Sequence, residues 1–289
     1  MHSYRAIAVP AAFLTALLLP AAAFAGWFAD DQGVYNVYQG DRHLGTEQVT
    51  FEQRSDSSVV ISMIDQVLPR GDGQVDTLQK NSALVVSGRD GSLRGYQSFE
   101  SVNGEMLTRG LSMADEVYTS YRQSKAGGFG DTYARPPGRI YVVDPQVFAL
   151  FDVIGRDMYA QDFDERTITL LYITDKDSVV YGRVKRLGKE SFKLGKQTVT
   201  AQKFRITDPW GEFFLWVSTK GRMLRLTLPS MGLRVDRDPS SLEPGHAIKP
   251  ITPPVTGAPA VIMAPTPKPK RPNPKSSAAR GDSIPPPGR

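Results

Sequence analysis

The chain has 289 residues, no cysteine and a formal charge of +5, with 35 Lys and Arg against 30 Asp and Glu. The lack of cysteine excludes disulfides, cysteine-based zinc sites and the lipid-modified cysteine of a lipoprotein. The positive excess belongs to the C-terminal tail, because residues 239–289 carry a net charge of +5 and residues 26–238 a net charge of −1. We therefore expect no nucleic-acid partner for the folded part.

The N-terminal segment has the layout of a secretory signal peptide. Arg5 supplies a positive charge, residues 6–23 form an apolar run, and residues 23–25 form a small-x-small cleavage site. Two prolines and an alanine-rich end favour removal of this run over its retention as a membrane anchor, which is the alternative. We predict cleavage after Ala25 and export to the periplasm of a protein that is not a lipoprotein.

Residues 26–238 are expected to form one domain whose strands mostly alternate apolar and polar side chains. A hairpin at residues 35–39 and 45–53 comes first. Further strands are expected at residues 58–68, 74–87, 93–100, 105–111, 117–121, 166–174, 178–187, 196–207, 211–218 and 222–228. Glycine and proline predict a loop at residues 126–138, and residues 187–189 predict a hairpin turn. This succession of hairpins favours an antiparallel meander of about ten or eleven strands over β-α-β units.

One principal helix is predicted near the middle of the chain. Asp144 can cap it, and Pro145 suits its first position, where a missing N–H costs nothing. Apolar side chains then follow at the spacing i, i+3, i+4 and i+7, namely Val147, Leu150, Phe151 and Ile154. Gly155 is a plausible end. The single apolar stripe of this helix must lie against a sheet or a ligand.

Some strands are apolar on both faces, which a sheet with one wet face does not need. In residues 213–217, Phe213, Leu215 and Val217 face one way while Phe214 and Trp216 face the other. Residues 59–68 and 167–173 share this property. The second face is covered either by curling of the sheet, by a partner, or by a lipid-like ligand, for which each buried methylene contributes about 0.8 kcal/mol.

Three short motifs resemble those of periplasmic proteins with a lipoprotein-carrier-like (LolA/LolB-like) fold, and more closely an uncharacterised exported β-protein family in that neighbourhood. They are Tyr35-x-Val37-x-x-Gly40-x-x-x-x-Gly45, Asp144-Pro145 with its apolar stripe, and Trp216-Val217-Ser218 followed by Leu224-Arg225-Leu226. The resemblance implies a strongly curved antiparallel sheet, a half-barrel, wrapping the helix around an apolar cavity that holds acyl chains. The carriers themselves contain more helix than is predicted here.

These observations predict a mainly β protein with an apolar groove for a lipid or a lipidated partner such as a lipoprotein. The side chains expected to line the groove are Phe148, Phe151, Ile154, Phe214, Trp216, Leu224 and Leu226. They could equally form a plain core. The leading function is a non-enzymatic cell-envelope binding protein.

A second predicted surface is basic. A hairpin would bring six basic residues near one tip, either as a solvated edge or as a patch for anionic headgroups or an acidic partner: Arg183, Lys185, Arg186, Lys189, Lys193 and Lys196. The tail, residues 239–289, contains 14 of the 22 prolines and predicts a disordered basic segment. The alternative function is therefore a structural envelope scaffold whose tail contacts anionic wall or membrane polymer.

Catalytic chemistry is not expected. His43 is the one histidine outside the signal peptide and the tail, and its turn position suits no catalytic triad. Carboxylates cluster at residues 162–165 and at Asp175 and Asp177, where turn or cap roles are the simpler interpretation. We predict no cofactor and no metal; a hydrolase built from scattered carboxylates is the remaining alternative.

Overall fold

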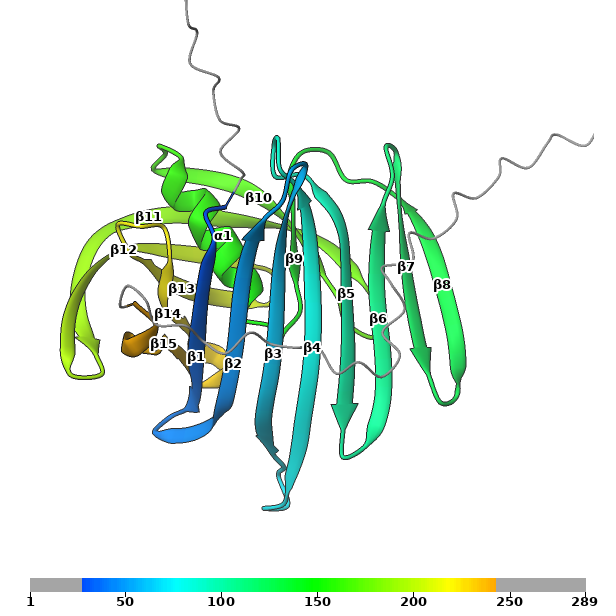
Figure 1. The fold of residues 1–289 in the computed structure, drawn as a ribbon, viewed down its shortest axis with the longest axis horizontal. Coiled ribbons are helices and arrows are strands. Elements are labelled where there is room, and N and C mark those ends of the chain that lie inside the picture. Colours follow the sequence, from blue (N-terminus) through cyan, green and yellow to red (C-terminus); the bar gives the residue numbers. More distant parts are fainter. Residues whose placement is uncertain (1–27, 243–289) are drawn as a thin grey trace, which may run out of the picture. The chain divides into compact units, whose positions relative to one another are not determined.

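The computed structural model describes residues 28–242, so that the predicted signal peptide and residues 243–289 of the tail lie outside it. In the described part, fifteen strands form one sheet. The sheet is curved and open and lies around the α-helix α1 (Ala149–Ala160), as Figure 1 shows. The fold is mainly β, as predicted, but has more strands than expected. No helix of residues 28–242 is long and apolar enough to span a bilayer.

The first eight strands are consecutive neighbours. They are β1 (Asp31–Gln39), β2 (Arg42–Gln53), β3 (Ser57–Pro69), β4 (Val75–Ser87), β5 (Leu93–Val102), β6 (Glu105–Met113), β7 (Val117–Ser124) and β8 (Gly127–Ala134). The others are β9 (Ile140–Val143), β10 (Glu165–Tyr172), β11 (Ser178–Leu194), β12 (Gln197–Asp208), β13 (Gly211–Val217), β14 (Met223–Leu228) and β15 (Leu233–Arg237). Two 3₁₀ turns, η1 (Pro229–Met231) and η2 (Pro239–Leu242), flank β15.

The sheet order is β8-β7-β6-β5-β4-β3-β2-β1-β15-β14-β13-β12-β11-β10-β9. The first and last strands therefore pair in the middle, with Tyr35 opposite Arg237, and the two edges are β8 and β9. Laid flat, a sheet of this size would be roughly 65 Å wide. The five residues 135–139 that join β8 to β9 can span little more than about 20 Å. The short connection therefore requires the sheet to curl.

Several sequence-based expectations are corrected. The glycine-rich segment predicted as a loop at residues 126–138 contains strand β8. Residues 187–189 lie inside β11 as a register shift, and the turn to β12 comes at residues 195–196. One β-α-β unit is present after all, because β9 leads through α1 into β10, its parallel neighbour. The folded part also extends past the predicted boundary at residue 238, since Ser241 is buried.

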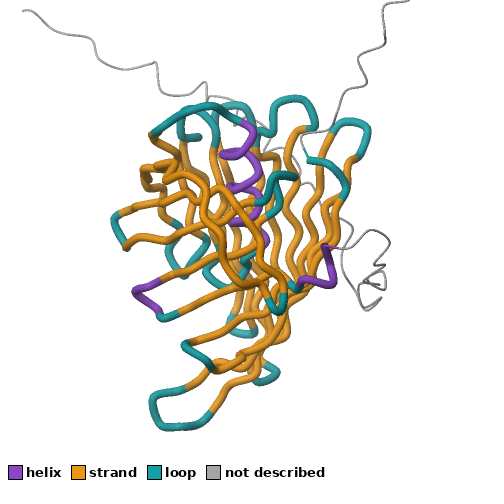
Figure 2. Tube along the Cα trace, turned by 90° about the vertical axis from the view of Figure 1, so that its left-hand side faces the viewer, coloured by secondary structure: helices purple, strands orange, loops and turns teal. Residues whose placement is uncertain are grey.

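Helix α1 begins later and ends later than predicted, at Ala149 and Ala160. Strands lie on both sides of it (Figure 2), and ten of its twelve residues are buried. Phe148 occupies the N-cap position without a side-chain capping bond. The cap comes from Glu47 on β2, whose carboxylate accepts the backbone N–H groups of Phe148 and Ala149 at 2.8 and 3.0 Å. Asp144, predicted as the cap, accepts the backbone N–H of Gln146 at 3.3 Å, ahead of the helix, and forms a buried ion pair with Lys80.

The buried cap Glu47 is expected to make stability depend on pH. Burial raises the pKa of Glu47 from 4.5 to about 7, despite hydrogen bonds from Ser62 and the helix N-terminus that lower it. Between these values the folded protein holds a proton that the unfolded chain releases. The free energy of unfolding should therefore fall by up to about 3 kcal/mol as the pH rises through this window. Urea unfolding from about pH 5 to 8 measures the slope; an equal slope in Glu47→Gln would contradict the assignment.

Candidate functional site

The seven side chains predicted to line one groove lie in two separate clusters. Phe148, Phe151, Ile154 and Leu226 belong to the main core, where Phe151 meets Phe213 edge-on at 5.1 Å between ring centroids. Trp216 and Leu224 belong to a second cluster, with Phe214 packed against it. That cluster is completed by Leu194 and Ala201 from the β11–β12 hairpin and by Leu242 from η2. Strand β13 is thus apolar on both faces because protein covers both.

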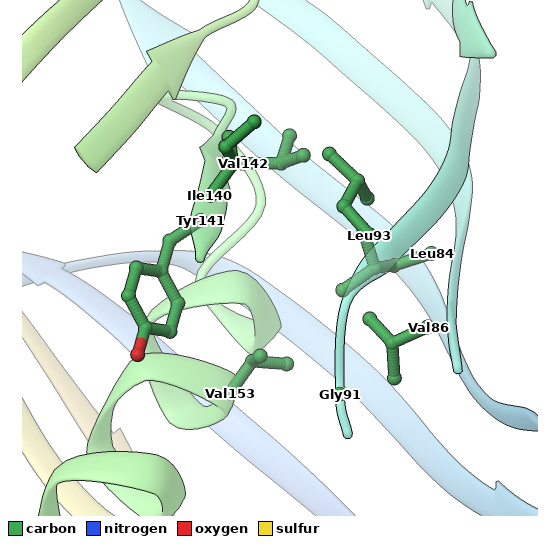
Figure 3. Close-up of a pocket in the computed structure, with 8 residues that line it drawn as sticks. All are labelled: Leu84, Val86, Gly91, Leu93, Ile140, Tyr141, Val142 and Val153. Atoms are coloured by element: carbon green, nitrogen blue, oxygen red, sulfur yellow. The ribbon is translucent and has the colours of Figure 1, made fainter. Parts of the chain in front are cut away.

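The main core contains little free space where strands β4 and β5, from one half of the sheet, pack against β9 and α1. Figure 3 shows this seam, in which Leu84, Val86 and Leu93 of β4 and β5 face Ile140, Val142 and Val153 of β9 and α1. The void between them measures about 10 Å³. That is no more than about one water molecule requires, whereas ligand pockets typically measure about 300–1,000 Å³. An acyl chain would enter here only if β4 and β5 separated from β9 and α1.

The polar side of α1 faces a buried ionic cluster, which we call the Asp31–Asp152 cluster. Asp152 accepts hydrogen bonds from Tyr35 at 2.5 Å, from Arg156 at 3.1 Å and from the backbone N–H of Met223 at 2.9 Å. Asp31 pairs with Arg156, with Arg237 at 3.0 Å and with Arg222 at 3.0 Å. Burial, and then the charge of Asp152, raise the pKa of Tyr35 well above its usual value. The cluster joins α1 to both central strands, β1 and β15.

A second set of charges runs from the interior to the surface, and we call it the Lys80 chain. Lys80 is fully buried and lies 2.7 Å from Asp144 and 3.0 Å from Glu100. Glu100 in turn accepts a hydrogen bond from Arg109 at 3.0 Å, and Tyr96 donates one to Asp144 at 2.9 Å. The charges alternate in sign along this path across β4, β5 and β6. Each charged group therefore has a neighbour of opposite charge.

The Lys80 chain ends at an open cleft of about 310 Å³ on β6, β7 and β8, beside the loop that joins β10 to β11. The side chain of Arg109 is 13% exposed and that of Arg122 is 28% exposed. Both guanidinium groups lie against one carboxylate oxygen of Asp175, at 3.3 Å for Arg109 and 2.9 Å for Arg122. The Nε of Arg109 is buried without a hydrogen-bond partner among the described residues.

Three aromatic rings form the rest of the cleft. Tyr121, Phe129 and Tyr133 line it and are all exposed to solvent. Tyr121 lies opposite Gly110 on the neighbouring strand, and a Cβ on that glycine would come within 2.0 Å of the ring. The ring therefore covers the position that a side chain would occupy. Burial raises the pKa of Asp177, which also lines the cleft.

The predicted basic patch is only partly assembled. Lys185, Lys189, Lys193 and Lys196 are exposed, and they follow β11 along its length and into its terminal turn. Arg183 pairs with Glu165 at 3.1 Å. Arg186 turns inward, where it donates to the carbonyl oxygens of Gln161 at 2.5 Å and Phe163 at 3.2 Å. The expected gathering of all six at one hairpin tip is therefore wrong.

Sequence reasoning missed the cleft. Arg109, Arg122 and the three aromatic residues lie in strands whose apolar–polar alternation is weak, and the glycines of β8 predict a loop. The available signal is the spacing of Phe129, Asp131 and Tyr133, which lie two residues apart and therefore share one face of a strand. Of the residues singled out earlier, His43 is exposed and lies beside Tyr38, at 5.2 Å between ring centroids. No group of three or more His, Asp or Glu within residues 28–242 could hold a metal ion.

No family model matches this chain, and no curated protein matches it. A similar solved structure is that of a β-barrel-like protein of domain of unknown function DUF1849 from Brucella abortus. The two share 9% sequence identity with a TM-score of 0.50, and the match covers 74% of this chain and 97% of the other. This likeness supports the mainly β, barrel-like architecture and nothing about activity.

Proposed function

We propose that this chain is an exported, non-enzymatic binding protein of the cell envelope, and that its ligand lies in the Arg109–Arg122 cleft. The cleft carries the proposal because it is about 310 Å³ in volume and combines charged donors with exposed rings. Fixed polar groups orient a ligand, and rings provide contact area at little entropic cost. The small void of about 10 Å³ between β4, β5, β9 and α1 supports an acyl-chain site less well.

Export remains part of the proposal and rests on the signal-like residues 1–25. The carrier-like resemblance is also kept as a proposal; the curved sheet around one helix supports the architecture that it implies. In the carriers the cavity lies inside the sheet. Here we place the ligand site on strands β6–β8 near one edge of the sheet, where the cleft of about 310 Å³ lies.

Gly110→Ala is expected to abolish ligand retention. The added methyl group must push the Tyr121 ring out of its place, which changes the cleft wall while leaving the core untouched. The mature protein would be incubated with a soluble extract of bacterial envelope small molecules, desalted, and examined by native mass spectrometry. Wild type should retain a small molecule that the variant loses.

Gly128→Ala is the matched control, because an added Cβ there meets only ordinary contacts of 3.4 Å or more. It should retain the ligand as wild type does. If wild type retains nothing, or if Gly110→Ala retains the molecule equally well, the cleft is not the ligand site.

A further inference from the structure

The feature that defines the ligand of the cleft is the position of Asp175. Its side chain is 78% exposed, yet its carboxylate oxygen is shared by Arg109 and Arg122 from two neighbouring strands. Asp175 belongs to the short loop between β10 and β11, whereas both arginines are fixed by their strands. A carboxylate is thus already seated between two guanidinium groups.

We propose that Asp175 occupies an anion site, and that the true ligand carries a carboxylate or phosphate that displaces it. This inference rests on the proposed function and adds the chemical class of the ligand. A guanidinium group binds a carboxylate or a phosphate through two parallel N–H donors. The same site then seats an attached ring, because Phe129 lies 5.9 Å from the Arg122 guanidinium and lines the same cleft.

Displacement is feasible because the ion pair with Asp175 is weak and Arg109 has a second partner. An ion pair this exposed contributes little to stability. Arg109 is also held at 3.0 Å by Glu100, which is itself paired with Lys80, so the loss of Asp175 would leave its position unchanged. With Asp175 withdrawn, Arg122 loses its ion pair while Arg109 keeps Glu100. Asp131 and Asp177 also line the cleft and offset part of this charge, but the vacated position between the two guanidinium groups still attracts an anion.

The test uses small probes that separate the anion from the ring. Phenyl phosphate and benzoate carry both, inorganic phosphate carries the anion alone, and benzyl alcohol carries the ring alone. Binding is measured by protein-observed NMR with the mature full chain. Phenyl phosphate or benzoate should bind more tightly than either single-feature probe, with signal shifts at residues 120–133.

Asp175→Asn should tighten binding of these ring-bearing anions about three- to tenfold, because it removes the carboxylate that competes for the site. The substituted residue is exposed, so the fold should not change. Arg122→Gln should weaken it at least about tenfold, with partial recovery in Arg122→Lys. Arg94→Gln is the matched control, because Arg94 forms a surface pair with Asp56 at 2.8 Å and does not line the cleft.

The proposal is overturned if Asp175→Asn binds the anionic probes no more tightly than wild type. It is also overturned if benzyl alcohol binds as well as phenyl phosphate, although the cleft would then still be a ligand site. The reverse failure is distinct: if anionic probes bind as expected but Gly110→Ala still retains its envelope molecule, the anion site stands and the cleft-based function does not.

Discussion

Replacing Arg156 by methionine is expected to lower the free energy of unfolding by about 3–5 kcal/mol. The guanidinium lies between Asp31 and Asp152, and the side chains of both are at most 2% exposed. It also stacks on Phe51, with 3.8 Å between the guanidinium carbon and the ring centroid. Methionine fills a similar volume but leaves two buried carboxylates to share Arg237 and the more exposed Arg222.

Urea denaturation at neutral pH measures this loss directly. Arg94→Met is the matched control, since it breaks an arginine–aspartate pair of similar distance in which both side chains are well exposed. That change should cost no more than about 1 kcal/mol. Equal losses in the two variants would show that the buried cluster contributes no more than a surface pair.

Lys80→Met should also lower the free energy of unfolding by about 3–5 kcal/mol, for a different reason. Lys80 is the cation that lies against Asp144, and the side chains of both are fully buried. Without the ammonium group, Asp144 is a fully buried carboxylate with no cation against it, whereas Glu100 keeps its ion pair with Arg109. The hydrogen bond from Tyr96 to Asp144 remains but supplies no charge.

A double substitution separates the missing charge from the missing contacts. Lys80→Met combined with Asp144→Asn removes both members of the pair, so it should lose clearly less stability than the sum of the single variants. Urea unfolding of all four proteins gives the coupling energy. Strict additivity would mean that the two groups do not interact across the 2.7 Å that separates them.

Local sequence patterns predicted most of the strands because alternation and turn residues act over a few positions. The same rules missed β8, since glycine at positions 127, 128 and 130 is untypical of strands. The apolar stripe predicts the helix but not its cap, because Glu47 lies 101 residues before Phe148 in the sequence. Contacts over such distances follow from tertiary register, which no local pattern contains.

The candidate site shows the same limit. Arg109 and Arg122 belong to no motif in the sequence, and Asp175 belongs to a carboxylate cluster for which a turn or cap role is the simpler interpretation. The three meet only because the β10–β11 loop reaches β6 and β7. The aromatic residues of β13 were correctly recognised as apolar on both faces. Their division between two clusters depends on where the β11–β12 hairpin lies, which a one-dimensional pattern does not determine.

The pairing of β1 with β15 at the centre of the sheet has a consequence for biogenesis. Register partners such as Val37 and Val235 are almost 200 residues apart, so the last strand must be made before the first can acquire its second neighbour. Until then β1 and β14 each present a bare row of backbone donors and acceptors. Such contacts form slowly and leave a nascent chain open to aggregation. The pairing of β15 with β1 is therefore expected to be a late and slow step of folding.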